Sequence, residues 1–168
     1  MEMIDFFVHE DFMPVLADRF DAFFEGLEPS VIVIDIESNG GEVLTLERME
    51  LKIKEKKEQG FIFVTLVENY AYSCGLFLFL LGDIRLAEDS AEFMYHSAGL
   101  SVNQRVTCTD LEDMLSILKP AELVGDRIIA ENTNLSKEMG VILKKNENYL
   151  SKSDLIFLGL MDENYELN

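Results

Sequence analysis

An α/β fold built from βαβ units is the fold class that this sequence predicts, and three observations predict it. Two short runs, VIVIDI at residues 31–36 and FIFVTLV at residues 61–67, have the apolar composition of parallel strands that are buried on both faces. Between them, residues 42–59 carry strong helix formers and are followed by Gly60, a residue typical of helix ends. A strand, a helix and a strand in this order form a βαβ unit, and we expect its crossover to be right-handed.

Elements on either side of this unit follow from the same patterns. Residues 14–27 repeat apolar side chains at helical spacing, with Asp11 available as the N-cap, and predict an amphipathic helix. The apolar run at residues 74–82 is much shorter than the ~20 residues of a membrane span, so we interpret it as a buried helix. Short strands are expected at residues 84–87 and 92–95.

The second half of the chain predicts mostly helices. Apolar side chains recur at helical spacing over residues 110–131, which indicates a long amphipathic helix with a kink at Pro120. Shorter helices are expected near residues 137–144 and over residues 153–157, followed by a terminal strand around residues 160–161.

Length and charge restrict the function classes. The 168 residues suit one domain spanning residues 1–168. Lys and Arg number 14 against 32 Asp and Glu, and the net charge of −18 repels the phosphates of nucleic acids and anionic membranes. The two cysteines form no disulfide framework and no metal-ligand pattern, and the N-terminus lacks a secretory signal. We therefore expect a cytoplasmic protein without a cofactor, a metal, a nucleic-acid partner or a membrane partner.

Two turns are candidates for a catalytic site. Residues 39–41 (NGG) and 72–75 (YSCG) follow successive apolar strands, and the carboxyl ends of parallel strands meet at one edge of a sheet. A serine hydroxyl becomes a nucleophile when a base accepts its proton, and backbone N–H groups must then bind the oxyanion. Ser73 is the candidate nucleophile and His96 the candidate base, while the glycine pair and the Cys74 N–H offer the donors.

Both side chains also have a purely structural interpretation. A serine at the start of a helix is more often an N-cap than a nucleophile, by roughly ten to one. A histidine at the end of a strand usually makes only structural hydrogen bonds. The residues alone leave these alternatives open.

A resemblance to a known family favours the catalytic interpretation. The segments VIVIDIESNGGEV, LVENYAYSCGLFLFLLGDIRLAEDSAEFMYH and YLSKSDLIFLGLMDE are similar, in order and spacing, to segments of Clp proteolytic subunits, over about residues 31–163. The resemblance implies a crotonase-like stack of βαβ units and a serine endopeptidase. It implies Ser73 as nucleophile, His96 as base, the N–H groups of Gly41 and Cys74 as the oxyanion hole, and substrate binding at Gly40.

The third member of the triad is assigned by the same resemblance. The family places an acid just before the aromatic-Leu-Ser segment at residues 149–151, and the matching residue is Glu147, where its best-known members have Asp. Asp154 and Asp162 are lower-ranked candidates. The family's His-Gln-Pro segment reads His-Ser-Ala at residues 96–98, a change expected to loosen the strand that carries the base. Cys74 is disfavoured as a nucleophile, because neighbouring residues of a helix do not share a face.

The resemblance also implies partners. Residues 110–131 resemble the family's handle helix, which interdigitates between rings, so a homo-oligomer is implied, a heptameric ring or double ring. Met114, Leu118 and Val124 would then face a partner subunit as well as their own core; a helix packed only on its own sheet is the alternative. The substrate would be a peptide or an unfolded protein. Only some thirty residues precede VIVIDI, so we expect the family's axial loop to be absent and leave an AAA+ unfoldase partner open.

Two other functions remain as alternatives. One is an inactive ring component that assembles with active partners. This alternative stays open because Glu147 stands where the family's best-known members have a catalytic Asp. An acyl-CoA enzyme of the crotonase group is the other, but it would not explain Ser73 together with His96. The short, divergent chain is similar to phage-encoded members, whose location would be the cytoplasm of the host cell.

Overall fold

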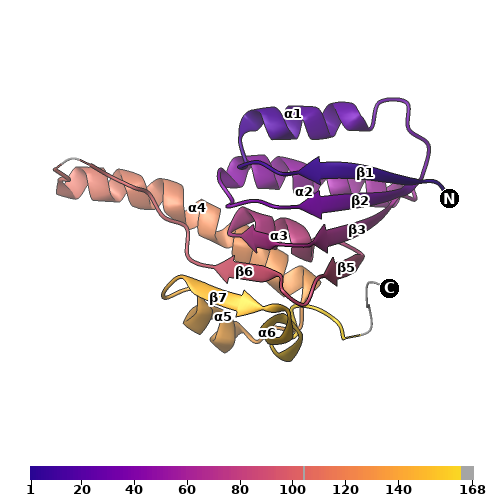
Figure 1. Ribbon diagram of the computed structural model, residues 1–168. Helices are drawn as coiled ribbons and strands as arrows, with labels where there is room; N and C mark the ends of the chain where they lie inside the picture. The colour runs from indigo at the N-terminus through magenta and orange to yellow at the C-terminus, as the bar shows by residue number, and fades with distance from the viewer. Residues whose placement is uncertain (104, 164–168) are drawn as a thin grey trace.

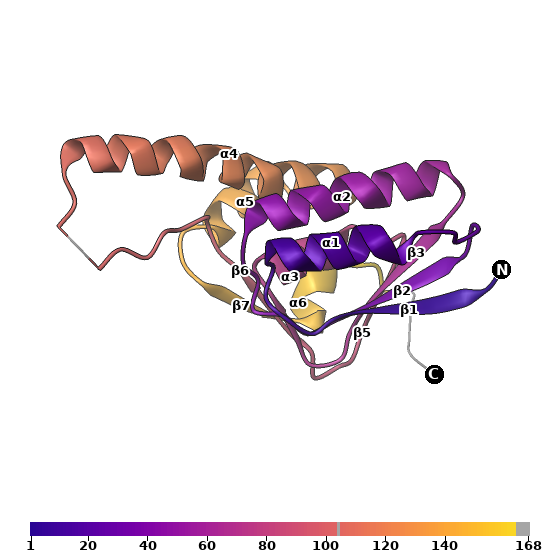
Figure 2. The same ribbon diagram turned by 90° about the horizontal axis from the view of Figure 1, so that it is seen from above.

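Four parallel strands form the main sheet of the computed structural model, which describes residues 1–103 and 105–163. Their order is β1-β2-β3-β5, with β1 (Met3–Val8), β2 (Val31–Ile36), β3 (Ile62–Val67) and β5 (Ile84–Ala87). The helices α1 (Pro14–Phe23) and α2 (Val43–Glu58) lie together along one side of this sheet (Figure 2). The predicted α/β class is therefore confirmed, and β2, α2 and β3 form the predicted βαβ unit.

A smaller sheet lies beside the main one and carries the candidate site. Its order is β4-β6-β7, with β4 (Tyr70–Tyr72), β6 (Glu92–Tyr95) and β7 (Asn148–Ser151). β4 runs parallel to β6, and β7 runs antiparallel to it. Helix α3 (Cys74–Leu80) begins one residue after β4, and all seven of its residues are buried. The end of β4 is thus fixed against the core of the molecule.

The long helix α4 (Cys108–Asn132) projects from the body of the molecule (Figure 1). It begins at a capping box, in which the Thr107 hydroxyl accepts from the Asp110 N–H and the Asp110 carboxylate accepts from the Thr107 N–H. The helix continues through Pro120. Its buried residues all lie in the C-terminal half, from Val124 onward. The N-terminal half therefore has no core of its own to pack against.

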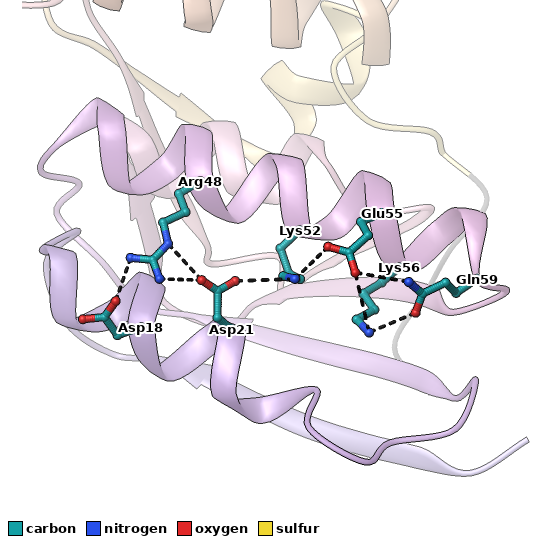
Figure 3. A network of polar contacts seen from close by, with 7 residues as sticks. All are labelled: Asp18, Asp21, Arg48, Lys52, Glu55, Lys56 and Gln59. Atoms are coloured by element: carbon teal, nitrogen blue, oxygen red, sulfur yellow. Dashed lines mark hydrogen bonds and ion pairs between the residues drawn. The ribbon is translucent and has the colours of Figure 1, made fainter.

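Charged side chains hold the helices together at the surface and beneath it. On the α1–α2 surface, Arg48 donates hydrogen bonds to Asp18 and Asp21 (Figure 3), in exposed contacts that solvent weakens. The Glu50 carboxylate of α2 is buried, and Arg127 of α4 donates to it. Burial alone would raise the pKa of Glu50, but the hydrogen bonds from Arg127 and Lys54 outweigh it and lower that pKa. This pair fastens the C-terminal half of α4 to the body.

Two predictions about element ends are wrong. Asp11 does not cap α1: Met13, which has no side-chain oxygen, occupies the N-cap position, and the helix begins at Pro14 without a side-chain cap. The predicted strand at residues 160–161 does not form. The N–H groups of Leu160 and Met161 both donate to the Leu155 carbonyl in a turn that closes helix α6 (Lys152–Phe157), so they are not free to pair with a strand.

The other helices agree with the predictions, whereas three strands were not predicted. Helix α5 (Lys137–Leu143) lies where a helix was expected. The strands β1, β4 and β7 add to the two sheets and were not expected from the local pattern. Within the described ranges, no helix is both long enough and apolar enough to cross a bilayer.

Candidate active site

Two parallel strands of the small sheet bring Ser73 and His96 together. Tyr72 at the end of β4 is paired with Met94 of β6, so the residues that follow the two strands emerge at the same edge. The Oγ atom of Ser73 lies 2.8 Å from Nε2 of His96. This is the length of a normal hydrogen bond, and a serine that donates to the imidazole is poised to give up its proton.

The backbone of Ser73 is strained. Its φ of 53° and ψ of −116° make it the single non-glycine residue with positive φ in the described part of the chain. Such conformations cost about 1–3 kcal/mol and persist where the surroundings enforce them. Here the Ser73 N–H donates to the Met94 carbonyl at 2.9 Å, and the Ser73 carbonyl accepts from the Phe77 N–H at 3.2 Å. Ser73 occupies the N-cap position of α3, but its hydroxyl makes no capping bond to the helix, so side-chain capping is not its role.

The glycine pair after β2 lies directly against the Ser73 turn. A Cβ atom built on Gly40 would be 2.7 Å from Cβ of Ser73 and 3.1 Å from the backbone nitrogen of Cys74. Gly40 also has a φ of 101°, which L-residues rarely adopt. A glycine is therefore required at this position on two independent grounds, and the two turns singled out in the sequence do converge.

The predicted oxyanion donors are not used in the backbone hydrogen bonding of the surrounding turns. In the described part of the chain, neither the Gly41 N–H nor the Cys74 N–H donates a hydrogen bond. The two residues are close to each other, because the Cys74 thiol donates to the Gly41 carbonyl over 3.4 Å. Burial of this thiol raises its pKa to about 12, so Cys74 is protonated at neutral pH and is a poor nucleophile.

Glu147 lies next to the paired part of β7, but it forms no hydrogen bond or ion pair with the His96 ring. In the β6–β7 ladder Tyr95 is paired with Asn148, so one further step of the same register would bring His96 opposite Glu147. The Glu147 side chain is exposed, and no carboxylate within residues 1–103 and 105–163 is hydrogen-bonded or ion-paired with His96. The structure thus brings together two members of the predicted triad.

The two lower-ranked acids lie in other surroundings. Asp154 forms the capping box of α6 with Ser151, whose N–H donates to it at 2.8 Å. The hydrogen bonds from Ser151 lower the pKa of Asp154, in keeping with a structural role. Asp162 lines a polar cavity that it shares with Arg85 and that contains neither Ser73 nor His96.

A cleft of about 330 Å³ of empty volume, partly open to solvent, adjoins the Ser73–His96 pair. Its apolar wall includes Phe77, Tyr95 and Gly125. Three charged side chains, those of Glu122, Asp126 and Lys144, form a charged wall of the same cleft.

Sequence reasoning missed the charged wall. Glu122 and Asp126 are one helical turn apart on α4, a spacing visible in the sequence, and both form ion pairs with Lys144. The Lys144 side chain comes from the end of α5, and only the tertiary structure brings it to α4.

The polar cavity around Arg85 is larger, with about 720 Å³ of empty volume, but offers no comparable chemistry. Arg85 donates to the carbonyls of Leu160 and Asn132 at 2.9 and 2.6 Å. Burial lowers the pKa of this guanidinium. Two of the cavity's carboxylates, Asp83 and Glu131, are already paired with lysines. A nucleophile with a base is therefore found in the smaller cleft.

Comparison with known proteins does not assign the chain to a family: no protein-family model matches it, and no curated protein is significantly similar to it.

Proposed function

We propose that this protein is a serine endopeptidase that hydrolyses peptide bonds in short or unfolded polypeptides. The observation that carries the proposal is the 2.8 Å contact between Ser73 Oγ and His96 Nε2. The backbone of this serine is strained and its hydroxyl makes no cap bond to the helix, so the hydroxyl is available as a nucleophile. The resemblance to Clp proteolytic subunits supports the same function and a crotonase-like fold.

The reaction proceeds in two steps at one serine. Ser73 Oγ attacks the carbonyl carbon of the scissile bond while His96 accepts its proton, and the N–H groups of Gly41 and Cys74 bind the oxyanion. His96 then gives the proton to the leaving amine, and the peptide bond breaks to leave an acyl-enzyme. Water, deprotonated by the same imidazole, releases the acid and restores the hydroxyl.

Glu147 is proposed as the residue that orients the imidazole. The continued β6–β7 register supports this role, since one more pair of the ladder would bring the carboxylate to the histidine. An acid in this position fixes the tautomer and stabilises the imidazolium. The required change is a local extension of β7 by one residue.

A ring-shaped homo-oligomer is proposed as the working form. The projecting half of α4 exposes large apolar side chains, with exposed fractions of 53% for Leu111, 48% for Leu115 and 62% for Ile117. A helix that presents such residues away from its own core is suited to pack against another subunit. The family's handle helix, which residues 110–131 resemble, has this role.

Hydrolysis of short fluorogenic peptides tests the function directly. The wild-type protein should cleave them, His96→Gln should lose at least about 10³-fold in rate, and His9→Gln should not change the rate, since His9 pairs with Asp35 instead. Equal rates in the two variants would reject the proposal. Size-exclusion chromatography coupled to light scattering tests the ring, and a monomer at micromolar concentration would contradict it.

An inactive ring component is the second candidate. One observation favours it: within the residues that the structure describes, no acid holds the His96 imidazole. A ring that assembles but neither cleaves peptides nor reacts with an active-site probe would support this function instead.

A further inference from the structure

The segment that directly follows His96 is tied to helix α4 by one carboxylate. The Ala98 N–H donates to Glu122 Oε2 at 3.0 Å. The Ser97 hydroxyl lies 3.4 Å from Glu122 Oε1 and donates a shorter bond, of 2.9 Å, to the Lys144 carbonyl. Ser97 and Ala98 stand where the resembled family has Gln and Pro, so this chain fixes the segment by other means.

The carboxylate is itself held in place. Lys144 forms an ion pair with Glu122 at 3.1 Å and a second one with Asp126. The Lys144 side chain is only 17% exposed, and that of Glu122 29%. Burial tends to lower the pKa of Lys144, but the hydrogen bonds that its ammonium donates to the two carboxylates outweigh burial and raise that pKa, so the ammonium stays charged. Both oxygens of Glu122 are thereby occupied.

We propose that Glu122 is a second positioning residue for the catalytic base, which acts on the backbone after His96 where Glu147 is proposed to act on the ring, an inference that rests on the proposed function. β6 ends at Tyr95, so no strand pairing fixes His96 itself. Apart from the contact with Ser73, its ring makes no hydrogen bond to the residues that the structure describes, so its position depends on the backbone that follows it. Glu122 anchors the backbone two residues beyond His96, and Lys144 keeps the carboxylate aimed at that backbone. A small displacement of a base costs rate steeply, up to about 100-fold for 1 Å.

The two histidines of the chain allow this to be measured at the imidazole itself. His9→Gln leaves His96 as the single histidine, so a nitrogen-15 spectrum reports His96 alone. When Ser73 donates to Nε2, the proton of the neutral ring is on Nδ1, and this tautomer has its own signal. In this background, Glu122→Ala should shift the signal toward a mixture of tautomers, whereas Glu122→Gln, which keeps an oxygen acceptor for Ala98, should preserve it.

The rate of Ser73 labelling by a fluorophosphonate probe gives the second readout. Glu122→Ala should slow labelling by about 10- to 100-fold, and Glu122→Gln should stay within about threefold of the wild type. In peptide hydrolysis the loss should fall on kcat and leave KM unchanged. Glu112→Ala, the same substitution on the exposed half of α4, is the control and should change neither readout.

Two outcomes overturn the inference, and one separates it from the proposed function. An unchanged His96 signal, or unchanged labelling, in Glu122→Ala would reject the positioning role. If that variant does not fold, Glu122→Met, which keeps the side-chain volume but has no acceptor, is judged by the same outcomes. A wild type that is not labelled, but whose His96 signal still responds to Glu122→Ala, would reject the peptidase and support the positioning role.

Discussion

Two serines of this molecule occupy the same local position and have different surroundings. Ser73 follows β4 and is the N-cap residue of α3, and Ser151 is the last residue of β7 and the N-cap residue of α6. Ser151 has an extended backbone, with a φ of −82°, and its hydroxyl accepts from the Asp154 N–H as an N-cap. Ser73 has a φ of 53°, makes no cap bond and contacts His96. The place of a serine at a helix start therefore does not define its role; its backbone conformation does.

The largest expected contrast between the two serines is in activity. Ser73→Ala should reduce peptide hydrolysis by roughly 10⁴-fold or more, because the nucleophile is removed. Ser151→Ala should leave it unchanged, because Ser151 acts only on α6. Initial rates on one fluorogenic peptide, at matched protein concentration, measure both, and a similar loss in the two variants would break the comparison.

The glycine next to Ser73 should be the next most sensitive position. Gly40→Ala should destabilise the fold by about 2–3 kcal/mol and misplace the serine, since the new methyl would meet Ser73 Cβ at 2.7 Å. Gly26→Ala is the matched control: it has a positive φ of 74° but nothing within 4 Å, so only backbone strain of about 1 kcal/mol is expected. Urea denaturation gives both values, and equal losses would mean that the contact at Gly40 is unimportant.

The two serines should differ much less in their effect on stability than in their effect on activity. Ser151→Ala removes a cap bond and should cost about 1 kcal/mol. Ser73→Ala removes no cap bond but loses the hydrogen bond to His96, so it should cost a similar amount, about 0.5–1.5 kcal/mol. Ser73→Gly should even stabilise the protein, because glycine adopts a φ of 53° without strain. Destabilisation by Ser73→Gly would show that the turn is not strained.

The smallest expected effect concerns the residue beside Ser73. The pKa of about 12 and the burial of Cys74 should protect its thiol from iodoacetamide at pH 8, while the exposed Cys108 reacts. Mass spectrometry of digested protein distinguishes the two sites, with urea-unfolded protein as the control in which both react. Fast alkylation of native Cys74 would revive it as a nucleophile.

The parts of the fold that were predicted from the sequence are those with a strong local pattern. VIVIDI and FIFVTLV became β2 and β3 because continuous apolar runs leave few other structures that bury them. The strand β4 has three residues, and its pairing is set by partners far along the chain. One such partner is the Ser38 carbonyl, which accepts a hydrogen bond from the Tyr72 N–H. Such partners are not visible in the local sequence.

The same distinction applies to the candidate site. Ser73, His96 and the glycine pair were named from turn chemistry and from the family resemblance, and the structure brings these residues together. Glu122 and Lys144 were not named, because only the packing of α4 and α5 makes them neighbours. The role of Glu147 stays a prediction.

Labelling with a fluorophosphonate probe tests the central claim most directly, because the probe reacts only with a serine whose hydroxyl is activated. The account predicts one adduct per chain, on Ser73 in the peptide map, absent in Ser73→Ala and strongly slowed in His96→Gln. Labelling that persists in Ser73→Ala, or a wild type that takes up no probe, would contradict it.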